Sequence, residues 1–281
     1  MQYYGRFFVI HPTLKQKIMN TKKFHGGILM PCLFLLLIFP IHAQVSMPSL
    51  QFTRVLKDFP AARCMLPTPY LSTSFRNDFC IKELMFKELE FDFIHQQDAL
   101  LVSANHYGHS GFGELAVHIG YGRRFGSKVA VALRGVYLLN HATHYAPRHS
   151  FTVDFSAYCQ ISRTIGLAVC LYNPIRMKYG IKGDEIIPMV FTLQAAYQPS
   201  EKLLFALYGE KKLPGTLDVG LEMYYHPLPN LMVSGTAALT HCGIGVFVPW
   251  KQIIFSIGAD WYYRVSVSTQ GEIEYYVEKK R

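Results

Sequence analysis

Residues 113–139 read GELAVHIGYGRRF, then GSK, then VAVALRGVYLL, with apolar and polar or small residues alternating on both sides of a short turn. From Leu115 to Tyr121 every second residue is large and apolar. A period of two is the spacing of a β-strand, whose successive side chains point to opposite faces. The glycine-containing turn at 126–128 therefore joins two antiparallel strands into a hairpin.

The same alternation continues along the chain and predicts an all-β fold. Strong period-two patterns cover 149–161, 187–198, 217–226 and 252–264. Weaker strands fit 89–96, 98–108, 165–172, 203–211, 231–240, 243–249 and 271–278. No convincing amphipathic helix lies among them. With one additional strand at 69–79, the count is about fourteen, an even number that returns both ends of the barrel to the same side.

Strand length and connection length favour a membrane barrel. Strands of 10–13 residues exceed the ~5–6 usual in soluble sheets and suit the ~9–11 needed to cross hydrocarbon. The links between strands alternate in length along the chain. Short links lie at 126–128, 162–164, 199–202, 227–230 and 249–251, and longer or more polar ones lie at 108–112, 141–148, 173–186, 211–216 and 265–270. The exception is 241–243, which is short where a long link is expected. Outer-membrane barrels show this alternation, with the longer loops external. We expect a single antiparallel transmembrane β-barrel. The alternative is a soluble periplasmic β-sandwich with the apolar set in its core.

The two residue parities of each strand predict a lipid face and a lumen face. Charged groups are costly in hydrocarbon, so the apolar set faces outward. Outward Tyr and Trp residues would form two interfacial girdles, as is typical of such barrels: Tyr121, Tyr197 and Tyr225 at the turn ends, and Tyr137, Trp261 and Tyr263 at the loop ends. The opposite parity includes Glu90 and Asp92 and supplies the candidate lumen-lining residues Glu114, Arg134, Asp154, Gln194, Glu222, Asp260 and Arg264.

The N-terminus has the layout of a secretory signal peptide. Lys22 and Lys23 precede the apolar run 28–39, and Ala43 is a small residue at the expected cleavage point. Twelve apolar residues fall short of the ~20 of a membrane-spanning helix. Export through this signal, followed by a barrel, places the protein in the cell outer membrane.

Three segments follow from this layout. Residues 1–43 form the signal peptide, although Met19 opens a more usual signal and 1–18 would then lie upstream of the true start. Residues 44–68, rich in proline, form an N-terminal periplasmic or plug segment. Residues 69–281 form the transmembrane barrel.

The basic net charge of +9 does not indicate nucleic-acid binding. Of 28 basic residues, eight lie in 1–43 and 279–281, which leaves 20 against 19 acidic residues in the body. A nucleic-acid binder concentrates basic charge in its folded body. The partner expected from composition is therefore outer-membrane lipid, and no nucleic acid.

Catalytic, metal and disulfide chemistry is weakly supported by the sequence. Five cysteines remain after signal removal, an odd number that argues against a disulfide framework, and the pairing of Cys64 with Cys80 stays open. His141, His144 and His149 lie near one loop, where solvated histidines are more common than metal ligands. His149 and Ser150 are adjacent and so point to opposite faces, which prevents activation of the serine. We expect no cofactor, no metal and no enzyme activity.

The chain also resembles a known group of barrels. The segment GYGRRFG at 120–126 and the step LYNP at 171–174 look like the fatty-acid-transporter-like outer-membrane barrels common in Bacteroidetes, and most like the PorV- and PorQ-type barrels of type IX secretion. The resemblance covers roughly 60–278. It implies a fourteen-stranded barrel with an N-terminal segment inside the lumen. No Asn-Pro-Ala element like that of fatty-acid transporters stands at the N-terminus.

Two functions are compatible with these observations. The first is passive transport of an unidentified solute, or a secretion-associated role. The second is an interaction scaffold, a closed barrel whose loops bind exported proteins or secretion machinery. Solute leakage through the purified barrel separates the two.

Cleavage of the signal peptide is expected within two residues of Ala43, because the apolar run ends there and polar Gln44 follows. N-terminal sequencing of material extracted from membranes checks this. A mature chain that still contains Leu33–Phe39 would contradict the segment boundaries above.

Overall fold

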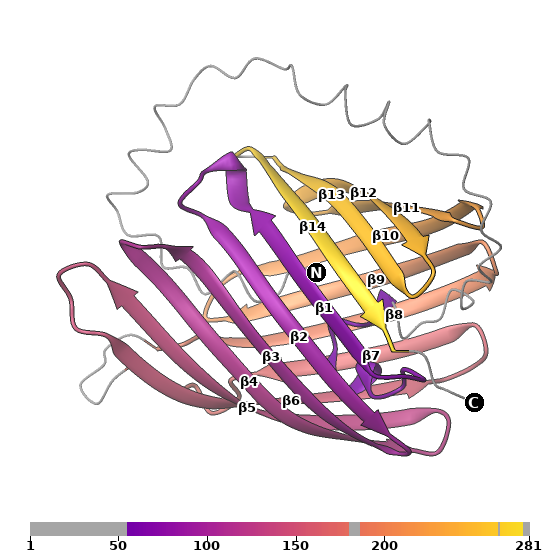
Figure 1. Cartoon of the computed structure of the whole chain (residues 1–281), viewed down its shortest axis with the longest axis horizontal. Coiled ribbons are helices and arrows are strands. Elements are labelled where there is room, and N and C mark those ends of the chain that lie inside the picture. Colours follow the sequence, from indigo (N-terminus) through magenta and orange to yellow (C-terminus); the bar gives the residue numbers. More distant parts are fainter. Residues whose placement is uncertain (1–54, 180–185, 264, 278–281) are drawn as a thin grey trace. The chain divides into compact units, whose positions relative to one another are not determined.

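The computed structural model describes residues 55–179, 186–263 and 265–277, and these form a closed antiparallel barrel of fourteen strands (Figure 1). The strands are β1 Tyr70–Asn77, β2 Met85–His95, β3 Asp98–His109, β4 Phe112–Phe125, β5 Val129–Ala142, β6 Arg148–Gln160, β7 Ile165–Tyr172, β8 Met189–Ser200, β9 Leu203–Leu213, β10 Leu217–Leu228, β11 Leu231–Ala238, β12 His241–Trp250, β13 Ile253–Tyr262 and β14 Val267–Tyr276. This confirms the predicted fold class.

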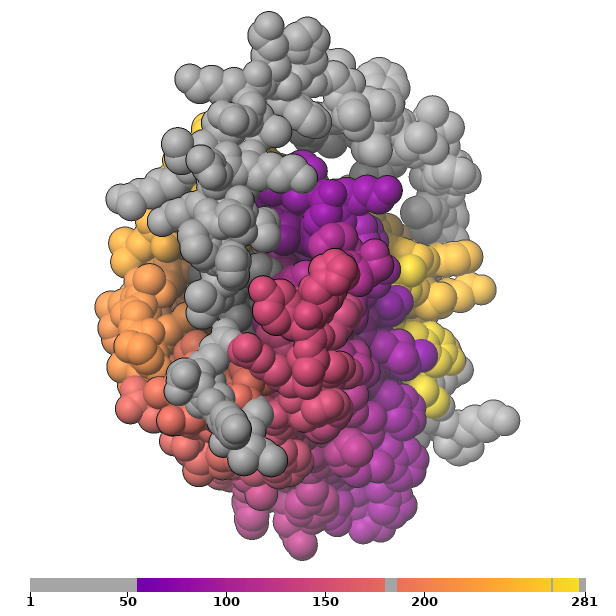
Figure 2. All heavy atoms as spheres, turned by 90° about the vertical axis from the view of Figure 1, so that its left-hand side faces the viewer, coloured from indigo at the N-terminus to yellow at the C-terminus, as the bar shows by residue number. Residues whose placement is uncertain are grey.

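Each strand pairs with its neighbours in sequence, and the barrel closes between its first and last strands. β1 pairs with β14 from Tyr70↔Tyr276 to Asn77↔Thr269, and with β2 on its other side. The space-filling view shows the same order, with the yellow end of the chain next to the indigo start (Figure 2). Closure leaves no free sheet edge, which is a condition for spanning hydrocarbon with strands.

The exterior of the barrel is apolar. Ile119, Leu133 and Phe255, all near mid-strand, are 60%, 56% and 39% exposed. The predicted girdle residues are exposed as well, among them Tyr121, Tyr197, Tyr225, Tyr137, Trp261 and Tyr263. A soluble sandwich would bury this set, so the burial pattern excludes that alternative. Together with closure, the apolar exterior makes the chain a transmembrane barrel of the outer-membrane type.

Helix contributes little to the described residues. A short helix α4 spans Pro60–Arg63, and a 3₁₀ turn η1 spans Asp78–Cys80. None of the helices among the residues described is long and apolar enough to cross a membrane. The predicted signal peptide, residues 1–43, lies outside the described residues.

The connections agree with the sequence pattern at one end of the barrel and less well at the other. The turns at 96–97, 126–128 and 201–202 are short, and 173–188 is the longest connection between strands. The predicted long link at 108–112 is wrong, because Gly108↔Gly113 and His109↔Phe112 continue the ladder. Polar and glycine residues resemble a loop in sequence, but they are compatible with a strand that extends beyond hydrocarbon.

The five cysteines among the described residues are all free thiols: Cys64, Cys80, Cys159, Cys170 and Cys242. Cys64 is buried and Cys80 is exposed, so the open question of their pairing is answered in the negative. The barrel is therefore held by its hydrogen-bond ladder and its interior packing, without a disulfide among these residues.

Leu133 provides a test of the lipid-facing parity. Leu133→Arg should destabilise the barrel by ~2–4 kcal/mol, the cost of a basic side chain near the bilayer midplane. Leu133→Ala should cost less than the ~2–5 kcal/mol of a packed core, because lipid chains flow into the vacated space. Unfolding of both variants in lipid vesicles measures the difference. Equal and severe losses would indicate that Leu133 faces a rigid core.

Candidate functional site

The N-terminal segment Val55–Leu66 is buried inside the barrel. Leu56, Phe59 and Ala61 are at most 1% exposed, and α4 within this segment packs against β4, β5, β6 and β7. Pro60 occupies the first turn of α4, where its missing N–H costs nothing. The backbone N–H of Ala61 donates to Ser156 Oγ on β6 at 3.3 Å. We call residues 55–66 the lumenal segment.

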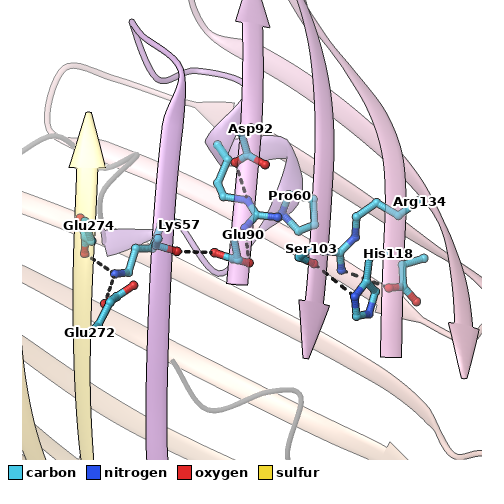
Figure 3. A network of polar contacts seen from close by, with 12 residues as sticks. Lys57, Pro60, Glu90, Asp92, Ser103, His118, Arg134, Glu272 and Glu274 are labelled. Carbon is cyan, nitrogen blue, oxygen red and sulfur yellow. Dashed lines mark hydrogen bonds and ion pairs between the residues drawn. The ribbon is translucent and has the colours of Figure 1, made fainter. Parts of the chain in front are cut away.

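Lys57 connects the lumenal segment to β14. Its Nζ donates to Glu272 Oε2 at 2.6 Å and to Glu274 Oε1 at 2.5 Å (Figure 3). Both carboxylates are 1% exposed, and the Lys57 side chain is 14% exposed. Burial by itself lowers the pKa of Lys57, but the two carboxylates outweigh burial and raise it above its ordinary value. Lys57 is therefore a permanent cation.

Arg63, the last residue of α4, connects the segment to β2. Its guanidinium forms an ion pair with Glu90 and a second one, Nε to Asp92 Oδ2, at 3.2 Å. The side chains of Arg63 and Asp92 are 2% and 0% exposed. Figure 3 shows Glu90 and Asp92 on the same stretch of β2. A buried pair of this kind is strongly disrupted when one partner is removed.

These contacts belong to a larger acidic surface where the barrel closes. In register, Ser72 of β1 lies between Glu90 and Glu274, and Ser74 lies between Glu88 and Glu272. Five lumen-side carboxylates thus lie on the two strands that flank β1, and we call this set the acidic wall: Glu88, Glu90, Asp92, Glu272 and Glu274. Lys57 and Arg63 lie against it.

A second polar cluster anchors the longest loop. Arg134 Nη2 pairs with Asp154 Oδ2 at 3.1 Å, and the two are register partners across β5 and β6. Asp154 also accepts from the backbone N–H of Asn173 at 3.3 Å. The Asn173 amide donates to Ile187 O at 2.7 Å and accepts from Thr152 Oγ1 at 2.7 Å. Asn173 has φ 48° and is 1% exposed, so it fixes both ends of the connection 173–188.

The other candidate lining residues are distributed around the lumen. Gln194 donates to Glu222 Oε2 at 3.1 Å across β8 and β10. Glu114 accepts from Asn140 at 3.3 Å. Glu114 and Arg134 lie on paired strands, but the register opposes Arg134 to Gly120 and Asp154 rather than to Glu114.

Asp260 on β13 is 4% exposed and lies opposite Gly243 and Ser268. Arg264, with which it was expected to share a strand face, lies outside the described residues.

The lumenal segment also touches the wall formed by β4. A Cβ added at Gly122 would collide with the sulfur of Cys64. A side chain at 122 is therefore accommodated only if the Cys64 thiol moves aside. Burial raises the pKa of the Cys64 thiol to about 12, which keeps it protonated at neutral pH. Nearby, Ser103 and His118 share a hydrogen bond at 3.2 Å.

The histidines of the loop region have separate partners. His149 Nδ1 lies 2.6 Å from the Tyr137 hydroxyl, whereas Ser150 Oγ donates to Lys178 O at 2.9 Å. The two residues therefore form no nucleophile–base pair. Across the described parts of the chain, no three His, Cys, Asp or Glu residues come together as a metal ion would require.

The contacts of the lumenal segment were not predicted. The resemblance to known barrels implied a periplasmic or plug segment at 44–68, of which 44–54 lie outside the described residues, while Lys57 and Arg63 carried no distinguishing signal. Asn173 was noted only as part of the LYNP step. Their partners lie on strands far away in sequence, and only the register brings them together.

Arg63→Met should destabilise the folded chain by about 3–5 kcal/mol, because Asp92 then remains as a buried charge without its cation. Adding Asp92→Asn should recover part of that loss. Urea unfolding in detergent micelles measures both variants. An unchanged free energy of unfolding for Arg63→Met would show that this ion pair does not hold the segment.

Comparisons with known proteins give the fold. No protein-family model matches the sequence, and no curated protein is significantly similar to it. Among solved structures, the toluene transporter TodX of P. putida superimposes with a TM-score of 0.61 at 9% identity, covering 79% of this chain and 93% of TodX. The monoaromatic hydrocarbon channel CymD gives 0.56 at 9% identity, covering 84% and 95%. The chain shares the fold of outer-membrane channel barrels.

Proposed function

We propose that this protein is a passive transport channel of the outer membrane whose lumen is closed by the lumenal segment, and that solute passes when the segment shifts. The observation that carries the proposal is the way the segment is held. Ion pairs of Lys57 and Arg63 attach it to β14 and β2. When the segment shifts, these charged groups lose their ion pairs and are hydrated by water instead.

Buried ion pairs contribute little net stability compared with apolar packing, but they fix position strongly. In a permanently closed barrel, apolar side chains on the lumenal segment and on the facing strands would give a more stable interior. Here the lumenal segment contacts four carboxylates, and Arg134, Asp154 and Gln194 line other parts of the same interior. This distribution supports a lumen that is exposed to water during function.

The similar structures support transport as the general activity. TodX is a toluene transporter and CymD is a monoaromatic hydrocarbon channel. The interior of this chain carries acidic and basic side chains in ion-pair contact on β2, β5, β6 and β14. For this reason we propose a small polar solute here in place of a hydrocarbon.

The competing proposal is a scaffold that remains closed and whose loops bind exported proteins or the type IX secretion machinery. Its support is the anchored loop 173–188, which Asn173 fixes at both ends. A scaffold needs no movement of the lumenal segment, so flux through the barrel separates the two functions.

Gly122→Cys offers a reversible lock for the test. The Cys64 thiol must rotate aside to admit the added Cβ, and the two side chains then lie next to each other. Oxidation at alkaline pH, where more of the thiol is ionised, should tie the lumenal segment to β4. The mature chain is reconstituted in liposomes, and swelling in arabinose is measured before and after reduction. We expect slow swelling when the disulfide is formed and recovery when it is reduced.

Gly209→Cys is the matched control, because a Cβ added at Gly209 has no heavy atom within 4 Å. It should swell at the wild-type rate under both conditions. Equal swelling of the locked and reduced Gly122→Cys chains would show that the segment need not move. Absence of swelling in every chain, with each barrel folded, would favour the scaffold.

A further inference from the structure

The acidic wall has more carboxyl groups than the lumenal segment pairs. Among the described residues, the wall contributes five carboxylates, and the segment brings Lys57 and Arg63 together with the acidic Asp58. Arg76, the basic residue of β1, is paired with Asp78 at 2.7 Å. The wall therefore has more carboxyl groups than the segment has basic groups to pair with them.

The wall also contains polar atoms that lack hydrogen-bond partners. The Tyr70 hydroxyl has none among the described residues, although Tyr70 is 0% exposed. In register, Tyr70 lies between Asp92 on β2 and Tyr276 on β14, so its hydroxyl belongs to the same surface. Oε1 of Glu88 is likewise buried without a hydrogen-bond partner. Buried polar groups of this kind are normally satisfied, and their presence indicates a missing partner.

We propose that the acidic wall, with the Tyr70 hydroxyl, is a binding site for organic cations that carry an ammonium or guanidinium group. Lys57 and Arg63 occupy this site as internal ligands while the lumen is closed. The solute class of the channel is then cationic. This inference rests on the transport function proposed above and adds the identity of the solute class to it.

The arrangement of the carboxylates favours an organic cation over a metal ion. A metal needs several ligands around one point, and no such group occurs among the residues described. The wall instead spreads its carboxylates over β14 and β2, with the serines of β1 between them. The two groups bound there now are an ammonium with two carboxylate partners and a guanidinium with two others. An external cation with an ammonium and a guanidinium group can take the place of the Lys57 ammonium and the Arg63 guanidinium.

Two measurements test the site. The first is the reversal potential of the reconstituted chain in a KCl gradient, where K⁺ should permeate several-fold better than Cl⁻. The second is calorimetric binding of agmatine, which has one guanidinium and one ammonium group, to the chain in detergent. Lys57→Met should bind agmatine several-fold more tightly, because the internal competitor for Glu272 and Glu274 is gone.

Glu272→Gln with Glu274→Gln should lower both the K⁺ preference and the agmatine affinity in the Lys57→Met background. The matched control removes two exposed carboxylates outside the lumen, Glu83→Gln with Glu201→Gln, and should change neither quantity. Heat-dependent migration in gels verifies that each barrel is folded.

The outcomes distinguish this inference from the proposed function. Two results would overturn the cation site without contradicting transport. The first is a current without preference for K⁺, and the second is an agmatine affinity that the Glu272 and Glu274 substitutions do not change. Absence of current together with agmatine binding that depends on the two glutamates overturns transport but supports the site. Absence of both overturns the two proposals.

Discussion

The pairing of β1 with β14 is the constraint on which the rest of the structure depends. In hydrocarbon no water satisfies the backbone, so every N–H and C=O must be bonded within the protein. The register from Tyr70↔Tyr276 to Asn77↔Thr269 completes the ring and removes the last free edges. Once the ring is closed, inside and outside are defined for every residue. The apolar parity then faces lipid, and the charged parity has only the lumen to occupy.

A closed ring with charged residues inside must also satisfy those charges. Arg134 and Asp154 do so as direct register partners, and Asp154 uses its second oxygen to hold Asn173. On the lumen side of β1, β2 and β14 the basic residue is Arg76, which is engaged by Asp78, whereas Lys87 of β2 is exposed. The lumenal segment supplies Lys57 and Arg63 instead. It therefore fills space and balances charge at once.

The fold could be predicted because strand periodicity is a local property, whereas much of the site depends on register. Alternation over 113–139 indicates a hairpin without knowledge of any other segment. In contrast, Lys57 meets Glu272 across a sequence separation of 215 residues, and no local pattern reports that pairing. Glu114 and Arg134 were correctly placed on neighbouring strands, yet the register gives Glu114 to Asn140. The polar stretch 108–112 was misread as a loop because strand ends outside hydrocarbon tolerate polar residues.

The position of the acidic wall beside the segment that covers it has a further consequence. The lumenal segment ends at Leu66 and β1 begins at Tyr70, so a very short connection ties the segment to β1, the strand that lies between the two that Lys57 and Arg63 contact. Short tethers give effective concentrations on the order of millimolar. Ion pairs that would be weak between separate molecules therefore hold the segment, and an external cation must compete at a comparable concentration. A site of this kind responds to abundant solutes and releases them readily, as passive conduction requires.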